Sequence, residues 1–157
     1  MAVSENLKLV CALYADWERG DYTASEWAHP EIESAIVDGP DPGVWRGVAG
    51  MADGFRSSMG VWKDVHAEVE EYRELDRDRV LVLELRRAKG KASGLELTQM
   101  RSEGAVLFDL RDGKVVRLAF YWERERAFAD LAWRAEAVSQ EDVRRAASRA
   151  RRGCRPR

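Results

Sequence analysis

Asp38 is the acidic residue that most invites a chemical interpretation. It ends a predicted strand over residues 32–38, on the same face as Ile32 and Ile36. That position predicts a carboxylate pointing into an apolar cavity, where a carboxylate binds its proton more tightly and suits proton transfer next to a carbonyl group. The structural alternative is that Asp38 caps the loop 39–43 through its backbone amides.

Aromatic residues form the second chemical signal, because six tryptophans are many for 157 residues. Aromatic walls suit planar or polycyclic apolar ligands, although any single tryptophan can equally be filling the core. We predict a ligand-binding pocket, with Trp122 as the preferred lining residue. The predicted lining comprises Trp17, Trp27, Trp45, Met51, Phe55, Trp62, Phe108, Phe120 and Trp122.

The remaining polar candidates are fewer. Glu84 interrupts an apolar strand and could enter the pocket, but a solvated position on the convex face is the expected one, since charged side chains seldom stay buried unpaired. The cysteines and histidines lack zinc-site spacing, and no nucleophile triad or phosphate-binding glycine loop is present. We therefore expect no metal ion and no cofactor.

The elements that must position these residues follow from hydrophobic periodicity. Ser4 is the expected N-cap of the first helix, and Asp112–Gly113 is a hairpin turn. The predicted helices cover residues 4–19, 23–28 and 47–60, with another beginning near Arg124. The predicted strands cover residues 32–38, 65–69, 79–88, 95–110 with a bulge near Gly104, and 115–123, and residues 39–43 and 89–94 are connecting segments.

Helices that precede a meander of strands define an α+β fold. Because the strands are long, the mostly antiparallel sheet should curl around the N-terminal helices and leave a cavity. We predict a domain over residues 1–133, followed by a C-terminal helix and basic tail over 134–157. The sequence lacks a secretory signal or a membrane helix, which predicts a cytoplasmic protein without a membrane partner.

The tail from Arg144 to Arg157 contains seven arginines and no acid, whereas the net charge of the whole chain is -2. The remainder is therefore acidic. No aromatic residues interleave with these arginines, so we interpret the tail as a solvated end and expect no nucleic-acid partner.

In addition to these patterns, several short segments of the sequence resemble those of a known protein family. His29–Pro30–Glu31–Ile32–Glu33, Gly43–Val44–Trp45–Arg46–Gly47, the segment 111–117 and the segment 121–127 resemble the SnoaL-like branch of the nuclear transport factor 2-like superfamily. The resemblance covers residues 4–133 and implies a cone-shaped α+β barrel. That superfamily includes isomerases, cyclases, hydrolases, dehydratases and binding domains, so the fold does not choose the reaction.

The resemblance also implies roles for two residues. Ketosteroid-isomerase relatives have a catalytic aspartate at the end of the first strand, which corresponds to Asp38. Their oxyanion-binding tyrosine lies on the first helix, about one position out of register with Tyr14. The second donor of those enzymes corresponds to apolar positions here, namely Val106, Phe108 and Leu110.

Three functions remain open at this stage. The first is binding of a small apolar molecule in an aromatic-lined pocket. The second is an isomerase or cyclase in which Asp38 is the general base on a carbonyl substrate, with Tyr14 or a water as the donor. The third is a homodimeric interaction module that uses the outer sheet face, where Arg117, Tyr121 and Glu123 are expected.

Overall fold

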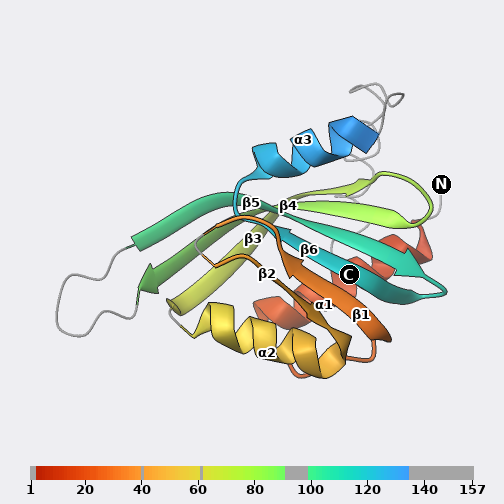
Figure 1. Cartoon of the computed structure of the whole chain (residues 1–157). Helices are drawn as coiled ribbons and strands as arrows, with labels where there is room; N and C mark the ends of the chain where they lie inside the picture. Colours follow the sequence, from red (N-terminus) through yellow and green to blue (C-terminus); the bar gives the residue numbers. More distant parts are fainter. Residues whose placement is uncertain (1–2, 40, 61, 91–98, 135–157) are drawn as a thin grey trace.

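Three helices and one six-stranded sheet make up the part of the chain that the computed structural model describes, residues 3–39, 41–60, 62–90 and 99–134 (Figure 1). In chain order the elements are α1 (Glu5–Glu18), β1 (Ala28–Ile36), β2 (Gly43–Arg46), α2 (Gly47–Met59), β3 (Trp62–Glu74), β4 (Arg79–Gly90), β5 (Gln99–Arg111), β6 (Lys114–Tyr121) and α3 (Arg124–Arg134). The strand order is β2-β1-β6-β5-β4-β3, and only β1 and β6 pair in parallel. The predicted α+β fold with a curved, mostly antiparallel sheet is confirmed.

The helices lie on opposite sides of the sheet. Alternation along β4 sends Val80 and Val82 into a core that includes residues of α1 and α2. Leu81 and Leu83 point to the other side and pack in a core that includes Ala127 of α3. Figure 1 shows α1 and α2 below the sheet and α3 above it. Both faces of the central strands are therefore covered.

Two local signals in the sequence produce the expected structures. The Ser4 hydroxyl accepts a hydrogen bond from the Leu7 backbone N–H at 3.1 Å, so Ser4 is the N-cap of α1 as predicted. Asp112 and Gly113 both have positive φ angles, 50° and 74°, which is the backbone conformation that a tight hairpin between β5 and β6 requires.

Residues 23–28 do not form the predicted helix. The Asp21 carboxylate accepts hydrogen bonds from the backbone N–H and the hydroxyl of Thr23, an arrangement that competes with helix formation. The backbone then joins the sheet, because the Val115 N–H donates to the Trp27 carbonyl and β1 starts at the next residue. The pairing with β6 thus overrides the local helical pattern.

The sheet differs from prediction at two further places. Gly43, expected in a loop, begins the short strand β2, which pairs with β1 through Ser34 opposite Trp45. The predicted bulge near Gly104 is also wrong, because β4 and β5 pair without interruption through Glu84 opposite Gly104. A Cβ atom at Gly104 would lie 2.8 Å from the Tyr121 carbonyl oxygen, so glycine is needed there for close approach of backbone.

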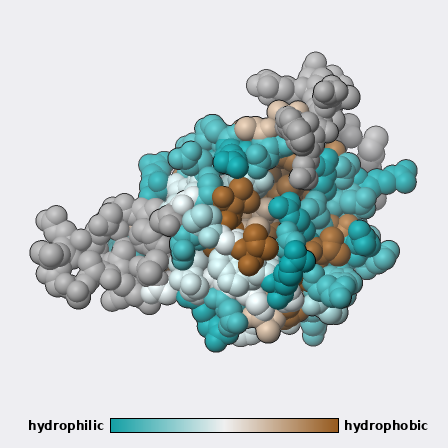
Figure 2. Space-filling model, viewed as in Figure 1, coloured by the Kyte–Doolittle hydropathy of each residue, from teal (hydrophilic) through white to brown (hydrophobic). Residues whose placement is uncertain are grey.

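The surface seen in Figure 2 is mostly hydrophilic, with a few hydrophobic residues grouped near the middle of this face. No helix within the described ranges is long and apolar enough to span a membrane. Most of the predicted C-terminal helix and basic tail, residues 135–157, lies outside the described residues, so the boundary after residue 133 stays a prediction.

Candidate functional site

A cavity of about 300 Å³ opens between α1, α2 and the inner face of the sheet. Side chains from both ends of the described sequence meet there, because β6 lies beside β1 in the centre of the sheet. The lining comprises Tyr14, Trp17, Glu18, Gly20, Tyr22, Ser34, Ile36, Trp45, Gly54, Phe55, Ser58, Val65, His66, Ala67, Glu84, Arg86, Phe120 and Trp122.

Aromatic rings in edge-to-face contact form one continuous wall of this cavity. Trp17 of α1 contacts Tyr14 with ring centroids 5.1 Å apart and Phe55 of α2 at 6.1 Å. Phe55 in turn contacts Phe120 of β6 at 5.3 Å, and Tyr22 stacks on Trp17 at 6.2 Å. Such contacts fix the orientation of the rings, so the wall is preformed.

Two further tryptophans of the lining rest directly on glycine backbone. A Cβ atom on Gly54 of α2 would lie 2.6 Å from the Trp45 ring, and one on Gly39 would overlap the Trp122 ring. Only residues without a side chain leave room for these indoles. The glycine content of α2, unfavourable for a helix in isolation, is therefore explained by the close packing of Trp45.

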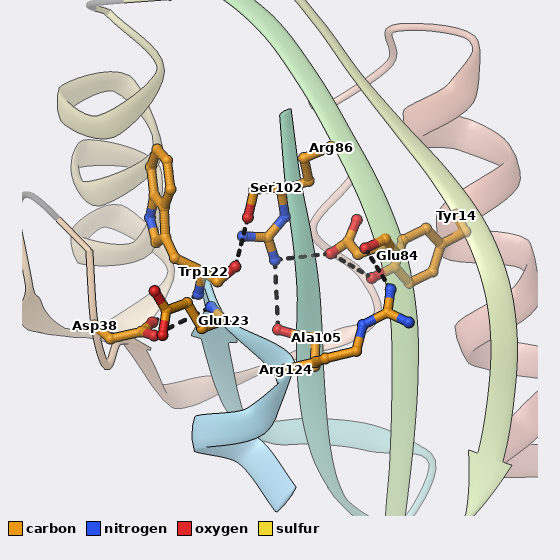
Figure 3. Close-up of polar contacts among 9 residues, drawn as sticks. All are labelled: Tyr14, Asp38, Glu84, Arg86, Ser102, Ala105, Trp122, Glu123 and Arg124. Atoms are coloured by element: carbon orange, nitrogen blue, oxygen red, sulfur yellow. Dashed lines mark hydrogen bonds and ion pairs between the residues drawn. The ribbon is translucent and has the colours of Figure 1, made fainter. Parts of the chain in front are cut away.

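A buried cluster of three polar side chains interrupts the apolar lining (Figure 3). The Arg86 guanidinium donates from Nη2 to Glu84 Oε1 at 2.9 Å, and the Tyr14 hydroxyl donates to the same oxygen at 3.3 Å. Arg86 Nη2 also donates to the Ala105 carbonyl oxygen at 3.4 Å, and its guanidinium lies 5.8 Å from the centre of the Phe120 ring. The cluster thus connects α1, β4, β5 and β6.

Glu84 is only 2% exposed, which makes the expectation of a solvated position wrong. The physical reason is that the outer face of β4 is occupied by the core under α3, so the strand has no solvated face. Arg86, two residues further and on the same face, offered the signal that was missed, since a base at that spacing can pair with the acid.

Burial strongly affects the hydroxyl of Tyr14. Removal from water, reinforced by the nearby negative charge of Glu84, raises the pKa of Tyr14 well above its usual value, and the positive charge of Arg86 only partly opposes this. Tyr14 therefore remains a protonated hydrogen-bond donor at neutral pH. Its hydroxyl is the buried donor beside the carboxylate, as Figure 3 shows.

Asp38 has a different environment from the one predicted. Its Oδ1 accepts a hydrogen bond from the Trp122 backbone N–H at 2.6 Å, and its Oδ2 accepts one from the Glu123 N–H at 3.1 Å (Figure 3). These amides belong to the junction between β6 and α3, not to the loop 39–43. Asp38 is not among the residues that line the cavity. The Asp38 carboxylate therefore fixes the backbone at Trp122 and Glu123.

The other predicted residues divide between the cavity and the core behind it. Tyr14 and five of the predicted aromatic residues line the cavity: Trp17, Trp45, Phe55, Phe120 and Trp122. Met51 and Phe108 are 5% and 0% exposed in the core, and Trp27 packs against Trp17 with ring centroids 6.1 Å apart. The side chain of Trp62 lies outside the described residues. Arg86 and Tyr22 line the cavity without having been predicted there, and Glu84 lines it although a solvated position was expected.

Metal-ligating side chains do not converge here, since the described residues contain no group of three His, Cys, Asp or Glu placed to hold a metal ion.

Comparison with known proteins places these observations in a family context. The model of a family described as the SnoaL-like domain matches residues 10–118. No protein of curated function matches the chain significantly.

Solved structures share the fold at low sequence identity. TerC, co-crystallised with polyporic acid, is 23% identical with a TM-score of 0.60, and the match covers 82% of this chain and 98% of TerC. A nuclear transport factor 2-like protein of unknown function from Burkholderia pseudomallei is 16% identical with a TM-score of 0.66, covering 81% and 97%. A protein from Catenulispora acidiphila with a ketosteroid isomerase-like fold, in complex with trimethylamine, is 13% identical with a TM-score of 0.59, covering 74% and 85%.

Proposed function

The chain belongs to the SnoaL-like domain family, and from this membership we propose that its cavity binds a small, planar, largely apolar molecule. The observation that carries the proposal is the preformed wall of Tyr14, Trp17, Phe55 and Phe120, into which one polar cluster projects. Ligand sites typically combine an apolar, aromatic lining with a few placed polar groups.

The dimensions of the cavity limit the size of the ligand. A volume of about 300 Å³ lies at the lower end of the range of small-molecule sites, roughly 300–1,000 Å³. Flat ring faces present large contact areas to planar molecules and little to branched ones. Two fused rings with one polar substituent meet both requirements. Two of the similar structures contain a small organic molecule, which supports binding at the level of the family.

A thermal-shift screen of planar bicyclic and tricyclic compounds tests the proposal. At 100 times its dissociation constant, a ligand should add about 2.7 kcal/mol to the free energy of unfolding. Ala67→Phe, which places a ring inside the cavity, should abolish the shift. Ala129→Phe, on an exposed position of α3, should leave it unchanged. A wild type that responds to no compound, or an Ala67→Phe variant that responds equally, would contradict the proposal.

Proton transfer on a carbonyl ligand is the second candidate function, and the position of the protonated Tyr14 hydroxyl in the cavity favours it. Tyr14 would donate to the developing negative charge on the carbonyl oxygen once its single hydroxyl proton had turned away from Glu84 Oε1, to which it now donates. Asp38, the general base implied by the resemblance, would first have to release two backbone N–H groups, whereas Glu84 already lies in the cavity.

Hydrogen–deuterium exchange on 2-tetralone separates these possibilities. An enzyme of this type should accelerate exchange at the carbon next to the carbonyl group, measured by NMR in deuterated buffer. Loss of the acceleration in Asp38→Asn would identify Asp38 as the base, and loss in Glu84→Gln would identify Glu84. If 2-tetralone binds and its exchange is not accelerated, binding is the only one of the two functions that is supported.

A further inference from the structure

We propose that Glu84 makes this pocket selective for uncharged ligands that carry a phenolic or enolic hydroxyl group, and that it excludes anions although an arginine lines the same cavity. The inference rests on the proposed binding function and specifies the chemical class of the ligand.

The two carboxylate oxygens of Glu84 have unequal partners. Oε1 accepts the hydrogen bonds of both Arg86 and Tyr14, at 2.9 and 3.3 Å. Among the described residues, none donates a hydrogen bond to Oε2, and the Glu84 side chain is 3% exposed while lining the cavity. In Figure 3 this second oxygen points away from Arg86 and Tyr14. Because Glu84 lines the cavity, its second oxygen can accept a hydrogen bond from a donor that the ligand supplies, and hydrogen bonds to a carboxylate are stronger than those between neutral groups.

The positive charge of Arg86 is already engaged. Its Nη2 pairs with Glu84 at 2.9 Å, its side chain is 13% exposed, and its guanidinium lies over the Phe120 ring. A carboxylate ligand that approached Arg86 would meet the Glu84 charge at close range. Arg124 does not compensate, because it donates to the backbone carbonyl of Glu84 and not to the carboxylate.

The other charged groups around the cavity point to the same selectivity. Glu18, on α1, adds a second acid to the lining, and Arg86 is the one lysine or arginine among the lining residues that the structure describes. His66 also contributes to the lining, from an exposed position on β3. A neutral hydroxyl satisfies Oε2 without adding charge, whereas an anion brings a second negative charge next to the first.

Three probes with the same ring system test this in the wild-type protein by isothermal titration calorimetry at neutral pH. The probes are 2-naphthol, its methyl ether 2-methoxynaphthalene, and 2-naphthoate. The ether lacks the donor and the naphthoate is anionic. We expect 2-naphthol to bind about tenfold to a hundredfold more tightly than either of the other two, the ratio typical of a hydrogen bond to a charged group.

Glu84→Gln provides the second arm, since it keeps the shape of the side chain and removes its charge. Arg86 then becomes available to an anion. Binding of 2-naphthol should weaken by about tenfold or more, and binding of 2-naphthoate should strengthen by about tenfold or more, so that the preference inverts. Glu71→Gln is the matched control, because Glu71 pairs with Arg73 two residues away, also at 2.9 Å, and does not line the cavity. It should behave like the wild type.

The outcomes distinguish this inference from the binding function itself. Equal affinity for the three probes in the wild type, or a Glu84→Gln variant that retains the preference for 2-naphthol, overturns the selectivity and leaves a planar-ligand pocket intact. Binding of none of the probes overturns both. The wild-type series decides the question even where Glu84→Gln does not fold.

Discussion

Asp38 lies beside Trp122 and Glu84 lies beside Tyr14, but the oxygens of the two carboxylates have different partners. Both oxygens of Asp38 accept backbone N–H groups, whereas those of Glu84 face side chains and the cavity. A carboxylate that caps backbone amides contributes to stability, and one that keeps an oxygen open can interact with a ligand. The first role therefore suits Asp38 and the second suits Glu84.

Asp38→Asn should lower the free energy of unfolding by about 1–3 kcal/mol, because the amide side chain cannot accept both backbone hydrogen bonds from residues 122 and 123. Urea unfolding measures the loss. Asp41→Asn, at an exposed position of the same loop, should change stability little. We expect the folded Asp38→Asn protein still to bind planar ligands. An unchanged stability together with lost binding would instead support the position inside the cavity that the sequence predicts for Asp38.

Tyrosine ionisation should make the fold sensitive to alkaline pH. Burial raises the pKa of Tyr14, and burial likewise raises those of Tyr22 and Tyr72. The folded chain therefore retains protons that the unfolded chain loses above about pH 10. The contribution of these tyrosines to stability should be constant below that pH and fall as the pH rises further.

Urea unfolding between pH 8 and pH 11 measures this loss. Tyr14→Phe removes one of the three groups, so its stability should fall less steeply, by up to about 1.4 kcal/mol per pH unit. Parallel curves for Tyr14→Phe and the wild type would contradict the assignment of the effect to Tyr14.

At the scale of elements, α2 illustrates how packing can outweigh propensity. The glycines of α2 cost helix stability in isolation, by up to about 1 kcal/mol each relative to alanine. Yet Gly54 lies under the Trp45 ring, and its missing side chain lets β2 and α2 approach closely enough to form one corner of the cavity. The helix is stabilised by this contact and not by its composition.

Two alanine substitutions in α2 should therefore have opposite effects. A Cβ atom at Gly54 would lie 2.6 Å from the Trp45 ring, so Gly54→Ala should destabilise the protein by about 1–3 kcal/mol and displace the tryptophan. At Gly50 the nearest Trp45 atom would be 3.6 Å away, an ordinary contact. Gly50→Ala should stabilise by up to about 1 kcal/mol. Thermal unfolding followed by tryptophan fluorescence compares the two, and stabilisation by both would refute the steric explanation.

At the scale of the whole molecule, α3 closes the side of the sheet opposite the cavity. Ala127 is fully buried against the sheet, and the Tyr121 hydroxyl donates to Asp130 Oδ2 at 3.0 Å. Arg124, at the start of α3, donates to the Glu84 carbonyl at 3.2 Å. The outer layer thereby supports the strand that carries the polar cluster.

This arrangement bears on the predicted homodimer. Tyr121, expected on an outer face available to a partner, is 3% exposed beneath α3, and Arg117 pairs with Glu33 at 3.3 Å. A dimer that used this face would have to include α3 in its interface. Homodimerisation itself stays a prediction, which sedimentation analysis of the full chain would test.

Charge placed between α3 and the sheet should destabilise the whole fold. Ala127→Asp would bury a carboxylate without a partner and should lower the free energy of unfolding by about 3 kcal/mol or more. Ala129→Asp places the same group on the exposed side of α3 and should have little effect. Chemical denaturation measures both, and equal stabilities would show that α3 contributes little to the packing of the sheet.

The sequence by itself determined the class of fold and most of its elements, because periodicity, the Ser4 cap and the Asp112–Gly113 turn are local properties. It also identified most of the aromatic lining, since large apolar residues at strand and helix periods must face an interior. The helix predicted for residues 23–28 does not form, because the pairing of β1 with β6 sets the backbone conformation there.

Only the tertiary structure decided that Glu84 and not Asp38 faces the cavity. Strand alternation places Glu84 on one of two faces, but which face is solvated depends on α3, a helix that follows β4 by more than thirty residues in the sequence. The partners of Asp38 likewise come from residues 122 and 123. Burial and hydrogen bonding between distant segments are set by how the layers pack, and a local pattern contains no information about the layer that will cover it.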